Sequence, residues 1–419
     1  MSGETERLSE ELERLAPGQW ELYEKAAESR ELDSAAGERA MVSRRDRGWA
    51  ARWWAGGGPR FACGSCAEEL PRAIAEASRV EAAAEDPPAW PSAKSEGART
   101  APEAEPPPDL FEEIQGRLAA ESRGEAALKR LTLRRGASSI RIVNGRGLDV
   151  FFSTTVYDGI ALAAGRKGAR ACEGRAVFRW DRGPDLDGLA RRLADRATLP
   201  LSDRGAPIDR GEWLLDPSVA AALLAAVAPL FCEETLPKWV HRRDLFSPGV
   251  TVVDDASADA HYDGEGTATR RLVVVEGGSL ASPLRDLRSA RRSGSPATGH
   301  GVRASYRVPP RSGPRRLFFE HGSPAPAREL LARVRRGLFA AALTAPARFD
   351  FERDRYEVEF TGIVVFGGRA EGAVAGALAK GRISQLLRRL AAFSTDRQFF
   401  PMPFLVGAPT VLVERSEFE

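Results

Sequence analysis

Residues 250–278, VTVVDDASADAHYDGEGTATRRLVVVEGG, decide the fold expected for the second half of the chain. Two short apolar runs, Val250–Val253 and Arg271–Val275, flank a stretch rich in Asp and Gly. β-Branched residues favour strands, whereas Gly and Asp favour turns. The alternation continues to the C-terminus, with further strands expected at 316–319, 356–366 and 410–414, and helices at 284–292, 327–342 and 383–393. These features predict a strand-rich, barrel- or sandwich-like domain over residues 206–419.

The first 205 residues carry one pattern twice: strand-like runs joined by turns and followed by a helix. The turns are expected at Asp46-Arg47-Gly48 and Asn144-Gly145, and the helices at 68–84 and 186–197. A short helix with leucines at 8, 12 and 15 opens the chain. Residues 85–109 contain seven prolines and are expected to form an extended connector. The pattern predicts an α+β domain over residues 1–205, with an antiparallel sheet and helices.

Charge and hydropathy exclude several classes of protein. The 419 residues include 61 basic and 59 acidic side chains, so no strong overall field attracts nucleic acid or an anionic membrane. The longest apolar run, Val219–Cys232, contains Pro229 and is too short to span a bilayer. The N-terminus is acidic and lacks the apolar segment of a signal peptide. We therefore expect a cytoplasmic protein with no membrane partner and no nucleic-acid partner.

Few residues have the spacing of a metal or redox site. Cys63 and Cys66 form a single C-x-x-C motif, and Cys172 and Cys232 stand alone, so no second pair completes a zinc knuckle. Two small residues at a strand end explain the motif without any metal. The four histidines, at 241, 261, 300 and 321, are too far apart for a helical zinc site, which needs two imidazoles one turn apart.

The carboxylate-rich segment around Asp259, Asp263 and Glu265 allows three interpretations. Asp side chains can cap backbone amides in a glycine turn, they can contact a peptide or partner, or they can bind a metal ion. The segment is four residues too short to supply the distal ligand of a calcium loop. A nearby cluster of arginines, at 285, 288, 291 and 292, allows either a solvated helix face or an anion-binding face.

The order of motifs in the second half resembles the TldD/PmbA family of metallopeptidases, also called peptidase family U62 or modulators of DNA gyrase. The motifs that carry the resemblance are the helix after Asp216-Pro217, Lys238–Leu245, Val252–Asp255, Tyr262–Gly266, Thr269–Arg271, Glu276–Gly278, Leu284–Asp286 and Ala297–Arg303. In the first half, Glu21–Tyr23, Arg47–Arg52 and Ile142–Gly147 are similar to the opening sheet of the family. His300 stands where an asparagine is more usual, and Phe318–His321 lacks the usual Asn-Thr pair.

The resemblance implies which of two subunit types this chain represents. TldD-type chains bind zinc through an H-E-x-x-x-H helix and a cysteine near the C-terminus. PmbA/TldE-type chains lack both and pair with a TldD-type chain in a heterodimeric protease that cleaves peptides inside a closed chamber. Here the corresponding helix, Val219–Val227, has no histidine or glutamate, and Phe399–Gly407 has no cysteine. The chain therefore resembles the PmbA/TldE type.

We accordingly expect a non-catalytic subunit that has no cofactor of its own, with zinc only in a TldD-like partner. The residues expected to contact a peptide substrate or the partner are Asp254, Asp255, Asp263, Glu265, Thr298, Gly299 and Arg303. Such side chains can fix the register of an extended peptide that adds to a sheet edge. The alternative is a stand-alone binding protein, or a divergent enzyme, that reuses the fold.

Overall fold

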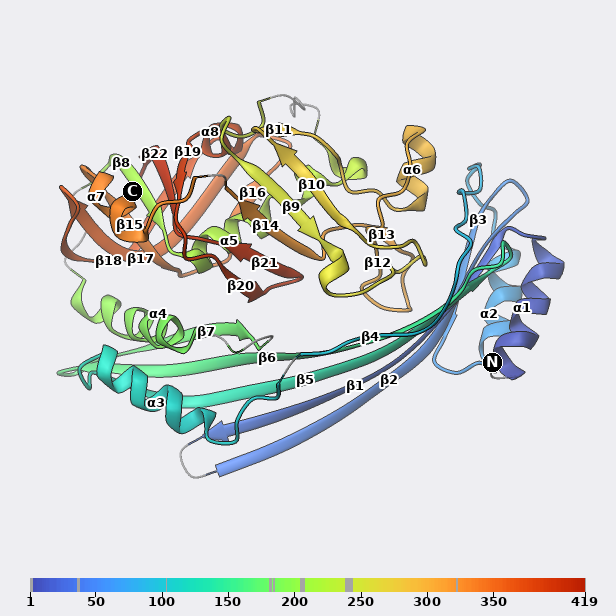
Figure 1. Cartoon of the computed structure of the whole chain (residues 1–419), viewed down its shortest axis with the longest axis horizontal. Coiled ribbons are helices and arrows are strands. Elements are labelled where there is room, and N and C mark those ends of the chain that lie inside the picture. The colour runs from blue at the N-terminus through green and yellow to red at the C-terminus, as the bar shows by residue number, and fades with distance from the viewer. Residues whose placement is uncertain are drawn as a thin grey trace.

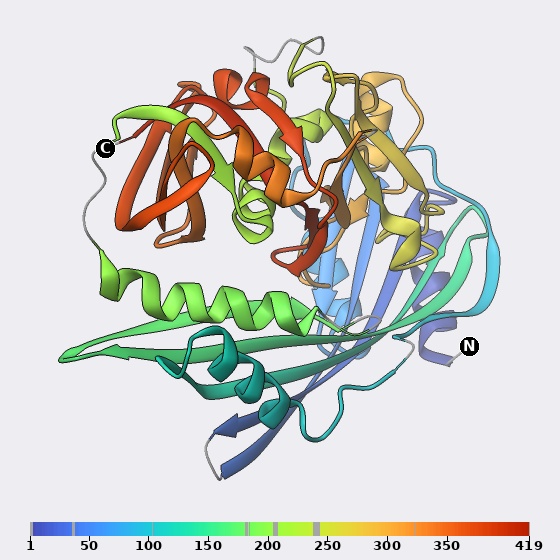
Figure 2. The ribbon, with the colours of Figure 1, turned by 60° about the vertical axis from the view of Figure 1, so that its left-hand side comes forward.

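The computed structural model describes residues 3–35, 38–102, 104–180, 183, 185–203, 208–237, 244–321 and 323–418. A long curved sheet from the N-terminal half lies beneath a strand-rich C-terminal half, which rests over its concave face (Figure 1). Figure 2 shows one helix, α4 (Leu186–Thr198), lying between the sheet and the C-terminal half. No helix among the described residues is long and apolar enough to cross a membrane.

The N-terminal half is built from two copies of one unit, helix–three antiparallel strands–helix. The first copy consists of α1 (Gly3–Leu15), β1 (Trp20–Ala35), β2 (Glu38–Ala55), β3 (Gly58–Gly64) and α2 (Leu70–Ser78). The second consists of α3 (Leu110–Glu121), β5 (Ala126–Asn144), β6 (Asp149–Lys167), β7 (Arg170–Arg179) and α4. The sheet order is β3-β2-β1-β5-β6-β4, and β7 also pairs with β6. The repeat predicted from the sequence is therefore present.

Each pair of helices buries one end of the long sheet. Leu8 and Leu12 of α1 pack with Trp53 and with Ile74 of α2 in one apolar cluster. A second cluster joins α3, α4 and the distal parts of β5, β6 and β7. The two clusters lie at opposite ends of the sheet (Figure 1). The middle of the sheet therefore depends on backbone pairing more than on helix cover.

Two features of the N-terminal half differ from expectation. The turn predicted at residues 46–48 does not exist, because Asp46 and Gly48 pair with Ala27 and Lys25 in the middle of β2. The proline-rich connector is not wholly irregular: its centre forms β4 (Lys94–Thr100), which pairs in parallel with β6. Both errors arise because the central sheet carries little apolar alternation for the sequence to reveal.

The C-terminal half contains two sheets and a small ribbon. The first sheet has the order β11-β10-β9-β14-β21-β20, and the second β16-β17-β15-β8-β22-β19 with β18 beside β17. The bounds of the strands are β8 Arg210–Leu215, β9 Thr251–Asp255, β10 Arg271–Glu276, β11 Ser279–Leu280, β12 Gly301–Val302, β13 Arg311–Ser312, β14 Arg316–Glu320, β15 Arg336–Leu343, β16 Arg348–Asp350, β17 Arg355–Phe366, β18 Arg369–Gly381, β19 Leu390–Phe393, β20 Gln398–Pro401, β21 Leu405–Ala408 and β22 Val411–Glu417. The helices are α5 Pro217–Ala226, α6 Leu287–Ser293, α7 Ala327–Arg333 and α8 Ile383–Arg388, and the short 3-10 turns are η1 Leu199–Ser202, η2 Ala228–Phe231, η3 Glu233–Thr235 and η4 Ala256–Ala258.

Helix α5 forms the centre of the C-terminal core. Asp216 caps it by accepting a hydrogen bond from the Ser218 amide (2.9 Å), and Pro217 occupies its first turn. Val219, Leu223 and Leu224 lie in one large cluster with residues from both sheets. A helix that is apolar all round must be buried, and α5 satisfies this by lying in the core that the two sheets share. The α+β class and the strand-rich C-terminal half are thus confirmed.

Three predicted helices are too long. The helix expected at 68–84 ends at Ser78. The helix expected at 327–342 ends at Arg333, and the following residues form β15. The helix expected at 383–393 ends at Arg388, and residues 390–393 form β19. Both strands are short apolar runs, which cannot be distinguished from buried helix by periodicity alone. Gly337 allows β15 to lie close to the neighbouring β8, because a Cβ at this position would lie 2.0 Å from the Glu212 carbonyl oxygen. The domain boundary after residue 205 falls outside the described residues and stays a prediction.

Candidate functional site

The carboxylate-rich segment forms a tight turn built around Asp263. Its buried carboxylate accepts hydrogen bonds from the backbone amides of Glu265 (2.8 Å), Thr267 (3.0 Å) and Gly301 (2.8 Å). Gly266 has φ of +75°, a conformation that side chains other than glycine rarely adopt. Of the three sequence interpretations, turn formation is therefore what the contacts of Asp263 show. Burial raises the pKa of Asp263, and the three amides oppose that rise.

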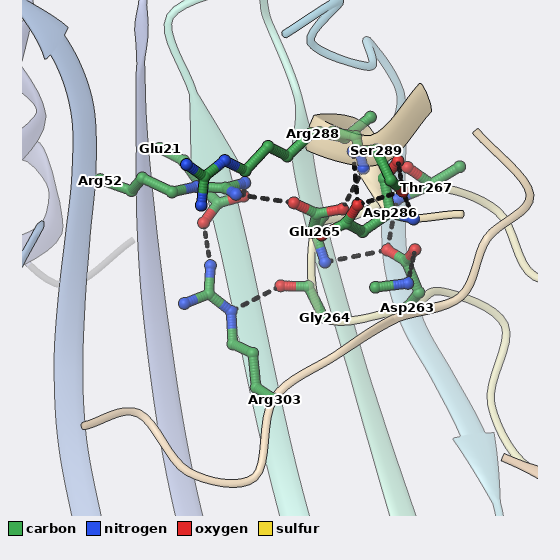
Figure 3. Close-up of polar contacts among 12 residues, drawn as sticks. Glu21, Arg52, Asp263, Gly264, Glu265, Thr267, Asp286, Arg288, Ser289 and Arg303 are labelled. Atoms are coloured by element: carbon green, nitrogen blue, oxygen red, sulfur yellow. Dashed lines mark hydrogen bonds and ion pairs between the residues drawn. The ribbon is translucent and has the colours of Figure 1, made fainter. Parts of the chain in front are cut away.

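A buried ionic network joins this turn to the long sheet (Figure 3). Arg52 of β2 donates to Glu265 Oε1 (2.7 Å) and to Glu21 Oε2 (3.0 Å), and Glu21 is its cross-strand neighbour on β1. Arg303 donates to the other oxygen of Glu21 and, through Nε, to the Gly264 carbonyl (2.7 Å). The side chains of Arg52, Glu21, Glu265 and Arg303 are at most 6% exposed. The network therefore fixes the loops of the C-terminal half against β1 and β2.

The network pairs two carboxylates with two guanidinium groups, and the buried carboxylates of Asp263 and Asp286 add further negative charge beside Glu265. Glu265 accepts from Arg52 and from the Leu287 amide (2.7 Å) at the start of α6, where Asp286 forms the N-terminal cap. Burial raises the pKa of Glu265 to about 8, although Arg52 opposes that shift. Burial alone would lower the pKa of Arg52, but Glu21 and Glu265 raise it. A proton on Glu265 would relieve the excess negative charge.

A second buried cluster surrounds Asp254 at the end of β9. One carboxylate oxygen lies 3.1 Å from His300 Nε2, and the other accepts from the backbone amides of Arg315 (2.9 Å) and Arg316 (3.2 Å). The other ring nitrogen, His300 Nδ1, lies 2.9 Å from the Thr298 carbonyl. The two ring nitrogens of His300 thus contact Asp254 on one side and Thr298 on the other. This cluster fixes the 298–301 loop to β9 and β14.

The remaining predicted contact residues also support the loops. The Thr298 hydroxyl accepts from the Arg285 amide (2.8 Å), and Gly299 has φ of +79° with no room for a Cβ beside the Ala268 carbonyl. Asp255 is half-buried and accepts from the Ser257 hydroxyl (2.6 Å). The turn and the 298–303 loop thus come together, as predicted. Of the seven predicted residues, Asp255 is the one whose side chain is not buried.

Three members of these clusters were not predicted as site residues: Glu21, Arg52 and His300. Glu21 and Arg52 lie among the apolar residues WELY and AARWW at strand ends, and a charge inside such a run is the available signal. Both residues lie in segments that are similar to the opening sheet of the family, but nothing local in those segments indicates Glu265 as a partner.

The arginines of the 285–292 segment bind carboxylates of this chain. Arg288 and Arg292 both contact Glu85 (2.5 and 3.0 Å), and Arg285 contacts Glu233 (3.0 Å). Arg291 reaches Asp86 (2.9 Å). Helix α6 therefore attaches the beginning of the proline-rich connector to the C-terminal half. The cysteines Cys63, Cys66, Cys172 and Cys232 are all free thiols.

The described residues do not fit a metal ion. No group of three or more His, Cys, Asp or Glu side chains with the geometry to hold one occurs among them. The side chains of α5 are those of Pro, Ser, Val, Ala and Leu, and the helix is packed in the core. Most of the motif Lys238–Leu245, namely residues 238–243 with His241, lies outside the described residues.

Comparison with known proteins gives a consistent result. Residues 210–419 match the family described as PmbA/TldA metallopeptidase C-terminal domain. An uncharacterised protein of Methanocaldococcus jannaschii is 29% identical over 184 residues, and a protein of Methanothermobacter thermautotrophicus named metalloprotease is 26% identical over 162 residues. These matches cover 40% and 36% of this chain, and only 42% and 35% of the two relatives.

Solved structures share the fold over the whole chain. The crystal structure of TldE from Thermococcus kodakarensis superposes with a TM-score of 0.84, at 18% identity, over 99% of both chains. A candidate modulator of DNA gyrase from Thermotoga maritima superposes with a TM-score of 0.79, at 18% identity, over 99% of this chain and 100% of that chain. At identities this low, the superpositions show that the fold is shared, and a shared fold does not by itself determine the activity.

Proposed function

Since this chain belongs to the PmbA/TldD metallopeptidase family, we propose that it is a non-catalytic, PmbA/TldE-like subunit of a two-subunit peptidase. A TldD-like partner would carry the zinc ion and the hydrolytic residues. This chain would help to enclose the peptide substrate. The TldE structure from Thermococcus kodakarensis, with its TM-score of 0.84, supports the subunit type by shape.

The composition and burial of α5 carry this proposal. A helical zinc site needs two imidazoles one turn apart, and a water-activating carboxylate beside them. Helix α5 offers no such side chain at any position between Pro217 and Ala226. Val219, Leu223 and Leu224 of this helix pack in the large C-terminal core together with Trp213 and Phe360. This composition supports the proposal that another chain would bind the metal ion.

The two buried clusters suggest how this subunit would act on a peptide. Their side chains are occupied with one another, so they would present the backbone of the 254–267 and 298–303 loops in a fixed shape. Rigid loops held by a supporting shell keep a binding surface in register. Asp255, which is half-buried, is the candidate best placed to contact a peptide directly.

Co-purification from the native host tests the proposal. The tagged full-length chain should recover a second chain that contains zinc when the complex is analysed for metals, and the complex should cleave unfolded peptides. The recombinant chain alone should contain no stoichiometric zinc and show no peptidase activity. Zinc and peptidase activity in the chain alone would contradict the proposal. Recovery of the chain alone and metal-free would favour a stand-alone binding protein.

A further inference from the structure

A cleft of about 680 Å³ lies beside the Asp254 cluster, with Arg316 in its lining, and away from the network of Arg52 and Glu265. One wall comes from the N-terminal half, with Thr154 of β6, Arg179 of β7 and Arg192 of α4. The other wall comes from the C-terminal half, with Arg397 and Phe399 at β20. In Figure 1 the strand β20 faces β6 and β7 across this space. The cleft therefore lies between the two halves of the molecule.

Arg192 brings an unneutralised positive charge to this cleft. Its side chain is buried, with the residue 4% exposed, and its guanidinium lies over the Phe400 ring at 5.3 Å. Nη1 donates to Gln398 Oε1, but Nε has no hydrogen-bond partner. Burial lowers the pKa of Arg192 to about 10, and the carboxylates of Asp216 and Asp185 oppose that shift without cancelling it.

Arg397 brings a second charge, and it is exposed to solvent. Its guanidinium stacks over Phe318 at 4.6 Å and lies near Phe399 at 5.8 Å, and Nη1 donates to the Phe319 carbonyl (3.3 Å). Within the described part of the chain, no carboxylate lies within 4.0 Å of a nitrogen of Arg192 or Arg397. The aromatic rings hold the Arg397 side chain in place without neutralising its positive charge.

The other charged groups at the cleft are already engaged. Arg179 pairs with Asp158 (2.8 Å), and Asp259 pairs with Arg316 (3.2 Å). Asp185 caps α4 by accepting from the Gly188 amide (2.9 Å), and its second oxygen accepts from Gln398 Nε2 (3.0 Å). An incoming anion would therefore meet Arg397 at the accessible end of the cleft and Arg192 at the buried end.

The shape of the wall indicates an extended ligand. Among the strands of the described residues, β20 stands last in its sheet and pairs with β21 on one side. The free side of an edge strand offers main-chain donors and acceptors to an extended chain. Phe399 adds a half-buried ring between the edge strand and the cleft. These groups together suit a polypeptide in extended conformation that carries a negative charge.

We propose that this cleft binds a carboxylate of an extended peptide, with Arg397 as its accessible ion-pair partner, Arg192 behind it, and β20 as the strand to which the peptide adds. The choice of a peptide as ligand rests on the proposed function. The carboxylate can come from an acidic side chain or from the peptide C-terminus, since both present the same two oxygens to a guanidinium.

Calorimetric titration of the isolated full-length chain tests the proposal. Short peptides of Ser, Thr and Ala would carry either Glu or Gln at the centre, and either a free or an amidated C-terminus. We expect binding of the peptides that carry a carboxylate. Binding of the amidated Glu peptide points to a side-chain source, and binding of the Gln peptide with a free terminus points to the C-terminus. Equal affinity for the neutral amidated Gln peptide, or no binding of any peptide, would overturn the proposal.

Variants at position 397 test the ion pair itself. Because a hydrogen-bonded ion pair is lost, Arg397→Gln should weaken binding of the carboxylate peptides by about tenfold. Arg397→Glu should shift the preference to a peptide with a central Lys. Arg369→Gln, which removes an exposed arginine of β18 outside the cleft, should leave all affinities unchanged. Unchanged binding in both Arg397 variants would overturn the proposal. The titration needs no second subunit, so its failure is distinct from a failure of co-purification.

Discussion

Arg52 is the residue on which the contact between the two halves of the chain depends most. Its guanidinium group has lost its water and is compensated by Glu21 on one side and Glu265 on the other. Removing one partner from a buried ionic pair leaves the other charge unpaired, which costs more than the pair contributes. Arg52 therefore stabilises the folded chain chiefly because its absence would leave Glu265 buried without a cation and Glu21 with Arg303 alone.

We expect Arg52→Met to lower the free energy of unfolding by about 3–5 kcal/mol, because Glu265 would be left buried without a cation and Glu21 would keep only Arg303. Urea denaturation followed by circular dichroism measures this change. Arg47→Met is the matched control on the same strand, since Arg47 forms an exposed pair with Glu24 (2.9 Å) and exposed pairs contribute little. Equal effects of the two substitutions would contradict the role assigned to Arg52.

Glu265 should make stability depend on pH. Its pKa is about 8 in the folded chain, against 4.5 for an ordinary Glu, so between these values the folded chain holds a proton that the unfolded chain releases. The free energy of unfolding then falls as pH rises from about 4.5 to about 8. We expect the melting temperature of the parent chain to fall relative to that of Glu265→Gln over this range.

Thermal melts of both proteins at several pH values between 5 and 8 provide the measurement. Glu24→Gln, which alters a half-buried carboxylate of β1 that pairs with the exposed Arg47, serves as the control, and its difference from the parent chain should stay constant. A constant difference for Glu265→Gln as well would show that folding leaves the proton affinity of Glu265 unchanged.

At the scale of elements, α6 and the connector form a latch defined by Glu85, Arg288 and Arg292. Glu85 is also held by its backbone amide, which donates to the Gly57 carbonyl (2.9 Å) in the β2–β3 turn. The latch thus attaches the connector to both halves at one point. Its arginines are partly exposed, so the contribution to global stability is small, whereas the local effect is direct.

Glu85→Ala should release the latch, and we expect faster amide hydrogen exchange in the segment 83–93 with little change in the melting temperature. Hydrogen exchange followed by mass spectrometry gives the comparison. Glu81→Ala removes an exposed glutamate four residues earlier and should leave the exchange rates as they are. If the two variants exchange alike, then the arginines of α6 do not hold the connector.

The elements also show what the sequence could predict. Turns, caps and apolar strand ends are local features, so the repeated unit, the Asp216 cap and the strands of the C-terminal half could be predicted. The centres of β2 and β5, such as residues 43–47 and 134–139, are polar or small and lie largely in the open middle of the sheet. No alternation of burial marks them, and the sequence therefore predicted shorter strands and a turn.

The candidate site was predictable in part for the same reason. Short glycine-containing loops can be recognised in the sequence, and they hold Asp263, Glu265, Thr298 and Gly299. The partners that give these residues their roles are far away in the chain. Arg52 precedes Glu265 by more than two hundred residues, and only the folded sheet brings the two side chains together.

At the scale of the whole molecule, separate apolar cores are joined by a polar contact. The clusters at the two ends of the long sheet and the large C-terminal core share no residues, and the ionic network is a buried polar link between β1, β2 and the C-terminal loops, beside a small apolar cluster that includes Tyr23, Ala50 and Tyr306. Cooperative unfolding of the full chain should therefore depend on this network.

We expect the parent chain to unfold in one transition, with coincident curves from tryptophan fluorescence and far-ultraviolet circular dichroism. Five tryptophans, at positions 20, 49, 53, 54 and 90, report on the end of the sheet beside the network, whereas circular dichroism reports on all elements. Arg52→Met combined with Arg303→Met should separate the two curves, because the sheet end then loosens before the C-terminal core unfolds. Arg47→Met should leave them coincident. Coincident curves in the double variant would mean that apolar contacts, such as Tyr306 against Tyr23 and Ala50, suffice to couple the two halves.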